Sequence, residues 1–342
     1  MVRYAWLFSL LLLLCLTGCD GASPRAKSEA DRGKATDVHR QEPGKKLPSL
    51  APLTLAPGDK LFVVATTSLV ADVVARVGGD AIQLVGLLPP GADPHAYQPT
   101  PDDLRAISDA QLIFVNGLGL EEALASILEE AGAKTVSVNV GVSVLRKEDG
   151  QGAAAGTEEG DHHADGNPHT WWSVDAVERW TRNIEQALSA VDPAHAAAYA
   201  ANAEAYRVEL AALRVDLKAL IGQIPVAERK LATDHDTLAY FAQAFDFQVV
   251  GLVVPSFSTL AEPSARHLAQ LQDQIRSGNV RAIFVGSTVN PRQAAQLAQD
   301  LGIRVVPIYT DALSGPDGPA PTYLDFMRHN GQLIVEGLRE GE

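Results

Sequence analysis

The chain contains very little cysteine: only Cys15 and Cys19 occur in its 342 residues. The sequence beyond them cannot form a disulfide or a thiolate metal site, so a transition-metal ion would need nitrogen and oxygen ligands. Basic residues are also scarce, with 28 Lys and Arg against 42 Asp and Glu and a formal net charge of −14. A chain this acidic repels nucleic-acid phosphates, which excludes nucleic acid as an expected partner.

The apolar run at the amino end is too short to span a membrane. It extends from Ala5 to Leu16 after one early positive charge, whereas a spanning helix needs about 20 apolar residues. The pattern is typical of a signal peptide, which we predict over residues 1–18. The Leu-Thr-Gly-Cys sequence that ends at Cys19 resembles the lipobox of bacterial lipoproteins. That resemblance implies that Cys19 carries lipid and that the protein is exported and anchored to the cell membrane, facing the outside or the periplasm.

Residues 19–58 are expected to form a flexible tether, because they are rich in charged residues, Pro, Ser and Gly and show no apolar periodicity. From residue 59 onward, short β-branched runs alternate with helical spacing, which predicts parallel sheets covered by helices. The expected strands of a first lobe, residues 59–190, are 61–67, 82–88, 111–117 and 134–140. Those of a second lobe, residues 224–342, are 230–233, 247–254, 281–286 and 303–309, with helices near 236–245, 262–276, 291–301 and 322–338.

A long helix is predicted between the two lobes, over residues 191–223. Asp192 is a suitable N-cap, Pro193 suits the first helical position, and Gly222 is expected to end the helix. One face carries a stripe of leucines, namely Leu210, Leu213, Leu217 and Leu220. The sequence therefore predicts an α/β protein of two similar lobes, with mainly parallel sheets joined by one long rigid helix.

An acidic insert rich in Gly and Ala occupies residues 148–166 of the first lobe. Its composition cannot build a core, so we predict a surface loop. The adjacent His162 and His163 leave two interpretations open. The loop is either a solvated charged segment or an auxiliary segment that captures metal ions weakly.

Four side chains that can bind metal occur at comparable places in the pattern. His95 and His169 each follow an X-Pro pair, and proline restrains the backbone just before the histidine. His235 and Asp311 each come directly after a predicted strand. Ligands of open α/β sheets bind beyond the carboxyl ends of the strands, so we expect all four side chains to converge on the cleft between the lobes.

Three imidazoles and one carboxylate form a set that zinc accepts in a tetrahedral arrangement and that manganese tolerates. A zinc hydrolase is one alternative, since three histidines can hold a catalytic zinc with an open position. However, Asp311 would close that position, and the sequence has no HExxH-type helix. Asp234 and Asp236, which flank His235 and could act as bases, are more simply explained as helix-capping residues. We therefore do not expect an enzyme.

Resemblance to a known family rests on four stretches: LLPPGADPHAYQPTPDDL, NPHTWWSVDAV, TDHDTLAYFAQAFDFQVVG and TYLDFMRHN. Together they resemble the metal-binding lipoproteins (cluster A-I) of the ABC importers that take up zinc and manganese. The resemblance covers roughly residues 60 to 340. It implies a fold with little hinge closure, metal ligands at His95, His169, His235 and Asp311, and delivery of the ion to a permease driven by a separate ATPase.

The resemblance also bears on which metal is bound. In this family a histidine at the third position accompanies zinc more often and a glutamate manganese, so His235 favours Zn²⁺. Asp311 as a full fourth ligand favours Mn²⁺, because some zinc members use three histidines alone. Many relatives carry an acidic residue where this chain has Gly286, so we expect different hydrogen bonding around the ligands here.

These observations predict a monomeric receptor for Zn²⁺ that delivers the ion to the permease. A manganese-specific uptake receptor is the main alternative. A surface adhesin with a structural metal is a further one.

Overall fold

The computed structural model describes residues 46–56, 58–146 and 166–339. The predicted signal peptide, Cys19, and the insert histidines His162 and His163 lie outside these residues. Within the described ranges, no helix has both the length and the apolar character needed to cross a bilayer. The strands are β1 (Leu61–Ala65), β2 (Ile82–Gly86), β3 (Leu112–Val115), β4 (Thr135–Ser137), β5 (Lys230–Thr233), β6 (Gln248–Leu252), β7 (Ala282–Gly286) and β8 (Arg304–Ile308).

The strands form two parallel sheets with the same strand order. The first sheet runs β2-β1-β3-β4 and the second β6-β5-β7-β8. The central strands are buried on both faces; every residue of β3 and of β7 is buried. Short apolar runs without alternation are what a parallel sheet covered on both faces requires. The prediction of two similar α/β lobes with parallel sheets is therefore confirmed.

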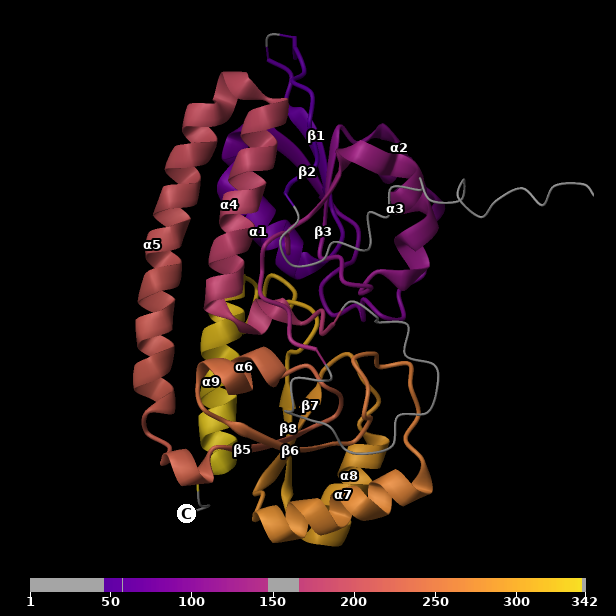
Figure 1. Cartoon of the computed structure of the whole chain (residues 1–342), viewed down its shortest axis with the longest axis vertical. Helices are drawn as coiled ribbons and strands as arrows, with labels where there is room; N and C mark the ends of the chain where they lie inside the picture. Colours follow the sequence, from indigo (N-terminus) through magenta and orange to yellow (C-terminus); the bar gives the residue numbers. More distant parts are fainter. Residues whose placement is uncertain (1–45, 57, 147–165, 340–342) are drawn as a thin grey trace, which may run out of the picture. The chain divides into compact units, whose positions relative to one another are not determined.

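Helices cover both faces of each sheet (Figure 1). Their bounds are α1 (Ser68–Gly78), α2 (Pro101–Asp109), α3 (Ala125–Ala131), α4 (Val174–Val191), α5 (Ala196–Ile221), α6 (Ala239–Ala244), α7 (Ala265–Gly278), α8 (Arg292–Leu301) and α9 (Tyr323–Leu338). In the first lobe α1 and α4 cover one face and α2 and α3 the other. In the second lobe α6 and α9 cover one face, and α7 and α8 the other.

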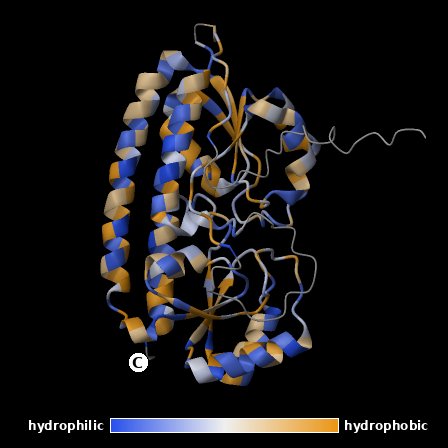
Figure 2. Cartoon of the chain, in the orientation of Figure 1, coloured by the Kyte–Doolittle hydropathy of each residue, from blue (hydrophilic) through white to orange (hydrophobic). Residues whose placement is uncertain are grey.

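One hydrophobic cluster extends through both lobes. It includes Val63 on β1, Leu213 on α5 and Phe284 on β7, all of them fully buried. Figure 2 shows the strands of both sheets as hydrophobic, whereas the long helices alternate between hydrophobic and hydrophilic residues. The two lobes therefore share a core, and α1, α4, α5 and α9 pack against one another along it.

The long helix α5 is shorter than the sequence predicts. It begins at Ala196, because residues 193–195 form a 3₁₀ turn instead. Asp192 occupies the N-cap position of that turn, with Pro193 as its first residue, but the N-cap of α5 itself is His195 and the Asp192 side chain caps no backbone N–H. Its carboxylate instead accepts hydrogen bonds from Tyr199 Oη and His195 Nδ1, both at 2.7 Å. At 26 residues α5 spans about 39 Å at 1.5 Å per residue.

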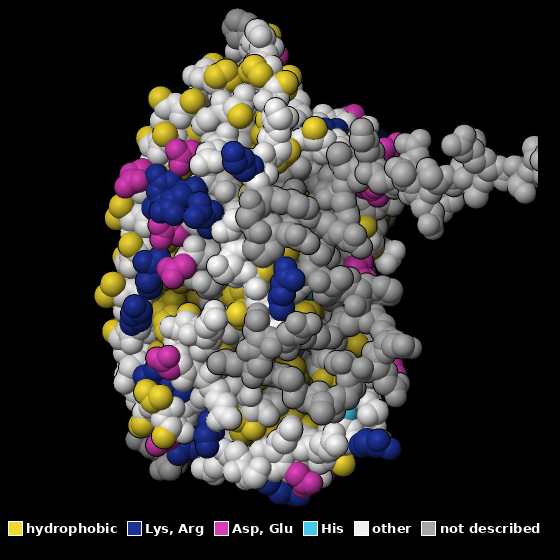
Figure 3. Space-filling view, in the orientation of Figure 1, with side chains coloured by type: hydrophobic (Ala, Val, Ile, Leu, Met, Phe, Trp, Pro, Cys, Tyr) yellow, Lys and Arg dark blue, Asp and Glu magenta, His cyan; other side chains and the backbone are white. Residues whose placement is uncertain are grey.

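Ion pairs line the outer side of α4 and α5. Arg214 contacts Asp175 at 2.6 Å and Glu178 at 2.8 Å, and Arg207 contacts Glu185 at 2.8 Å. Figure 3 shows basic and acidic side chains gathered over these helices. Partly exposed ion pairs contribute little to stability, so the helices are held chiefly by the buried leucine face of α5.

We expect Leu210→Ala to lower the free energy of unfolding by about 2–5 kcal/mol, because Leu210 is fully buried and its loss leaves a cavity. Val208 lies on the same helix but is 63% exposed. Val208→Ala is therefore the matched control, with an expected change within about 0.5 kcal/mol. Urea unfolding of the metal-free protein measures both. Equal losses in the two variants would contradict the assignment of the buried face.

Candidate metal centre

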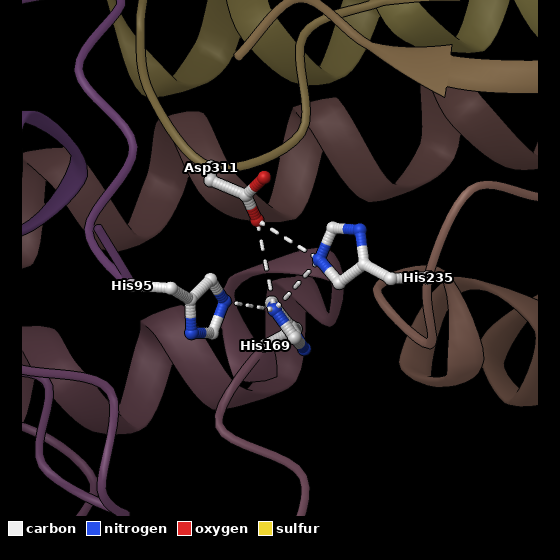
Figure 4. Close-up of side chains that lie close together, drawn as sticks. All are labelled: His95, His169, His235 and Asp311. Carbon is white, nitrogen blue, oxygen red and sulfur yellow. Dashed lines mark hydrogen bonds and ion pairs between the residues drawn. The ribbon is translucent and has the colours of Figure 1, made fainter. Parts of the chain in front are cut away.

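The four residues singled out in the sequence lie together in the structure. His95, His169, His235 and Asp311 each offer one ligand atom, and these atoms all lie within 4.8 Å of one another. All four side chains point toward a common centre (Figure 4). None is more than 3% exposed to solvent. The site is thus a buried cluster of three nitrogen donors and one oxygen donor.

Each residue reaches the cluster from the carboxyl end of its sheet or from the connection that leads into α4. His95 lies in the turn after β2, His235 two residues after β5, and Asp311 three residues after β8. His169 immediately precedes the 3₁₀ turn of residues 170–172. The carboxyl ends of parallel strands share one edge of a sheet, which is where open α/β folds bind ligands. The two sheets therefore present their binding edges to the same point.

Four of the six distances between donor atoms lie close to those of a tetrahedral ion site, and the other two do not exceed 4.8 Å. His169 Nε2 lies 3.2 Å from His95 Nε2 and 3.2 Å from His235 Nε2. Asp311 Oδ1 lies 3.6 Å from His169 Nε2 and 3.7 Å from His235 Nε2. A tetrahedron with zinc–ligand bonds of about 2.0–2.1 Å has edges of about 3.3–3.4 Å. Small adjustments would therefore bring all four atoms to bonding distance of one ion.

The Asn-Pro-His sequence holds His169 by a local turn. The side-chain oxygen of Asn167 accepts hydrogen bonds from His169 N at 3.0 Å and from His169 Nδ1 at 2.8 Å. Asn167 is itself held, since its amide group donates to Asp236 O at 2.8 Å. Because Nδ1 donates, Nε2 carries the lone pair and faces the centre. In the Asp-Pro-His sequence, Asp93 Oδ1 likewise accepts from His95 N at 2.9 Å.

Asp234 fixes His235 in the same way, and this role was missed in the sequence. Its Oδ1 accepts from His235 N at 2.7 Å and from His235 Nδ1 at 3.1 Å. The helix-capping interpretation of Asp234 is wrong, because α6 begins only at Ala239 with Leu238 as its N-cap. Gly286, where we expected different hydrogen bonding around the ligands, interacts through its backbone. Its N–H donates to Asp234 Oδ2 at 2.8 Å.

The two carboxylate oxygens of Asp311 have different surroundings, and Oδ1 is the one that faces the centre. Its Oδ2 accepts hydrogen bonds from Thr310 Oγ1 at 2.5 Å and from Thr288 Oγ1 at 3.3 Å. Its buried Oδ1 accepts no hydrogen bond from the residues that the structure describes. An unsatisfied buried carboxylate oxygen is costly, and a cation at the centre would satisfy it.

The charges of the cluster shift the pKa values of two of its members in opposite directions. Burial lowers the pKa of His235, but the carboxylates of Asp234 and Asp311 raise it by a larger amount. The pKa of His235 therefore lies well above its usual value. Burial raises the pKa of Asp311, but His235, His169 and His95 lower it more, so the net result is below the usual range. Without a cation, a proton on His235 therefore partly neutralises the cluster.

Hydrogen bonds between the lobes surround the cluster. Thr259 Oγ1, from the loop after β6, donates to Asp93 Oδ2 at 2.7 Å. Trp171 Nε1 donates to Thr310 O at 2.8 Å, which joins the chain beside His169 to the chain beside Asp311. These contacts hold the segments that carry the donors across the lobe boundary.

A polar network behind His169 also escaped the sequence analysis. Asn116 donates from its amide group to Pro168 O at 3.1 Å. The side-chain oxygen of Asn139 accepts from Thr170 Oγ1 at 2.6 Å and from Trp180 Nε1 at 2.7 Å. All of these groups are buried. They come from four separate segments, so no local sequence pattern could have brought them together.

Comparison with known families agrees with this architecture. The sequence model of the family described as zinc-uptake complex component A, periplasmic (ZnuA), matches residues 63–337. The chain belongs to the ZnuA family. The match confirms the resemblance stated above, and it includes all four donors of the cluster.

Individual members similar to this ZnuA-family chain are named for different metals. Manganese-binding lipoprotein MntA of Halalkalibacterium halodurans is 30% identical over 285 residues, covering 83% of this chain and 90% of MntA. Manganese ABC transporter substrate-binding lipoprotein PsaA of Streptococcus mitis is 32% identical over 292 residues, covering 83% of this chain and 91% of PsaA. The structure of the periplasmic zinc binding protein TroA from Treponema pallidum is similar with a TM-score of 0.72 and 25% identity, over 82% of this chain and all of TroA.

These names bear on two of the predictions from the sequence. MntA and PsaA are named as metal-binding or substrate-binding lipoproteins rather than as enzymes, so the prediction that the chain is not an enzyme is confirmed. The family is described as periplasmic and both relatives as lipoproteins, which confirms an extracytoplasmic, membrane-anchored location. Cys19 itself lies outside the described residues, and its lipidation stays a prediction.

We expect divalent metal binding at pH 7 to release protons from the site. The carboxylates of Asp234 and Asp311 raise the pKa of His235 and so favour a proton on its ring in the metal-free cluster, whereas a metal ligand must be neutral imidazole. Affinity should therefore weaken steadily as the pH falls. Calorimetric titration in buffers with different ionisation enthalpies measures the released protons. An observed enthalpy independent of the buffer would contradict this prediction.

Proposed function

We propose that this chain is the extracytoplasmic receptor of an ABC importer and that it binds one divalent metal ion through His95, His169, His235 and Asp311. The observation that carries the proposal is the convergence of their four buried donor atoms within 4.8 Å. Such an arrangement is not typical of a structural core, because buried polar groups there normally form hydrogen bonds with partners rather than point at one common centre.

The donor set favours Zn²⁺ as the cargo. Three imidazole nitrogens and one carboxylate oxygen form a tetrahedral set typical of zinc, whereas manganese prefers more oxygen ligands and a higher coordination number. The spacing of 3.2 Å between neighbouring Nε2 atoms supports a compact, four-coordinate site.

A manganese receptor is the second candidate. It is favoured by the names of MntA and PsaA, which are both called manganese proteins, while TroA is called a zinc binding protein. Asp311 Oδ1 also faces the centre without another hydrogen bond from the described residues, and a carboxylate ligand suits manganese.

The receptor would deliver its ion to a membrane permease driven by a cytoplasmic ATPase, with lipid on Cys19 keeping it at the membrane. We propose that it acts as a monomer. A surface adhesin with a structural metal would hold the ion without exchange, whereas a receptor must give it up. Exchange of bound ⁶⁵Zn for unlabelled zinc within minutes to hours supports the receptor, and retention over days supports the structural role.

Competition between the two metals tests the choice of cargo. The full-length protein, purified in detergent and stripped with chelator, is titrated with Zn²⁺ and Mn²⁺ together while bound metal is counted by mass spectrometry. We expect one Zn²⁺ per chain that excess Mn²⁺ does not displace. Preferential or equal binding of Mn²⁺ would assign the chain to manganese uptake, and absence of binding would refute the proposal.

We expect His169→Ala to weaken Zn²⁺ binding by more than about 100-fold, since loss of a direct ligand costs more than the roughly 10–100-fold typical of losing an outer partner. His195→Ala is the control, because His195 lies in the 3₁₀ turn before α5, outside the cluster, and should leave affinity unchanged. The double variant of His162 and His163, whose auxiliary role stays a prediction, should lose only weak additional binding. A larger loss in that double variant than in His169→Ala would place the primary site in the insert.

A further inference from the structure

Asp234 is held from both sides between β5 and β7. Its Oδ1 accepts from the backbone and ring of His235, at 2.7 and 3.1 Å, while its Oδ2 accepts from Gly286 N at 2.8 Å. Its backbone is equally constrained, since its N–H donates to Phe284 O at 3.1 Å and its carbonyl accepts from Val254 N at 2.7 Å. At 6% exposure the carboxylate is almost removed from water. Its position is therefore set by the sheet rather than by a mobile loop.

Different groups support the rings of His169 and His235. The Nδ1–H of His169 donates to Asn167, a neutral amide, whereas that of His235 donates to a carboxylate. A carboxylate behind a metal-binding imidazole orients the ring, fixes its tautomer and increases its strength as a donor. Of these two histidines, His235 is the stronger nitrogen donor toward the centre.

Gly286 provides the space that this arrangement needs. A Cβ at position 286 would lie 2.2 Å from Thr310 Oγ1, 3.0 Å from Asp234 Oδ2 and 3.0 Å from Val289 Cγ2. Thr310 Oγ1 is the hydroxyl that donates to Asp311 Oδ2. Any side chain at position 286 would therefore press at once on the group that holds His235 and on the group that holds Asp311.

We propose that Asp234 is a positioning residue that strengthens His235 as a nitrogen donor and thereby favours zinc over manganese, with Gly286 as the gap that admits its carboxylate. The inference rests on the proposed function and deepens it. Imidazole nitrogen suits zinc, whereas manganese is suited by oxygen ligands, so we expect zinc to gain more than manganese from a stronger nitrogen donor. Asp234 therefore acts on selectivity as well as on affinity.

The test compares Asp234→Asn with the unaltered full-length protein in competition against a chromogenic chelator, separately for Zn²⁺ and Mn²⁺. Asparagine keeps the size of the side chain and an acceptor for His235 Nδ1, but it removes the charge and replaces the oxygen that accepts from Gly286 N with an amide group that donates. We expect Zn²⁺ affinity to fall by about 10–100-fold and Mn²⁺ affinity to fall less, so that the ratio of the two decreases. The absorption bands of the Co²⁺-loaded protein should shift in the same variant, because the ligand field of His235 changes.

The control for the chemical change is Asp246→Asn, which removes an exposed carboxylate from the same lobe and should alter neither affinity.

A second variant, Gly286→Ala, tests the space at Gly286. We expect it to weaken binding of both metals, because it displaces Asp234 and Thr310 together. Its control is Gly315→Ala, where an added Cβ meets nothing within 4 Å. Unfolding midpoints of all variants show whether the fold is retained.

The outcomes separate the two proposals. An unaltered protein that binds neither metal refutes the proposed function and this inference with it. An unaltered protein that binds zinc, with Asp234→Asn showing the same affinities or the same loss for both metals, refutes the inference alone. A selective loss of zinc with an unchanged Asp246→Asn control supports it.

Discussion

The structure depends on holding three imidazole nitrogens and one carboxylate oxygen close together in a site that is almost completely buried. His95, His169, His235 and Asp311 direct their donor atoms at one point while almost completely buried. Such an arrangement is electrostatically unfavourable without a positive charge at the centre. Hydrogen bonds on the outer side hold the donors in place: His169 donates to Asn167, His235 donates to Asp234, and Asp311 accepts from Thr310. The same preorganisation that strains the metal-free site favours a cation of the right size.

The need to hold the four donors together explains why the two lobes share one hydrophobic core and are joined by hydrogen bonds. The donors come from both sheets, so a relative shift of the lobes would pull them apart. A single hydrophobic cluster continues from the first sheet through α5 to the second, and hydrogen bonds such as Thr259–Asp93 and Trp171–Thr310 cross the boundary beside the donors. Wide separation of the lobes would expose this core to water at a large cost in free energy. We therefore expect capture and release to use local movement of the donor segments.

Much of the fold follows from patterns local in the sequence. The two sets of strands were predicted within a few residues of where they lie, because β-branched runs bounded by turn residues mark buried parallel strands. The predicted start of α5 was too early, since residues 193–195 form a 3₁₀ turn and the Asp192 carboxylate accepts from Tyr199 and His195 rather than from backbone N–H groups of the helix. Capping residues at a helix start and acceptors for a distant hydroxyl look alike in a sequence, and packing decides between them.

By itself the sequence determined the α/β class, the four candidate donors and the absence of thiol ligands, because residue type, X-Pro-His spacing and strand ends are local properties. Only the tertiary structure decided how those donors are supported. Asp234 is a partner of His235 rather than a helix cap because α6 begins only at Ala239, and the pairing of β5 with β7 brings Gly286 N to its second oxygen. Asn139 supports the chain around His169 through Thr170 and Trp180. The contacts of Gly286 with Asp234 and of Asn139 with Thr170 and Trp180 join residues far apart in the chain. Their distances are set by the packing of sheets and helices, to which no local pattern in the sequence corresponds.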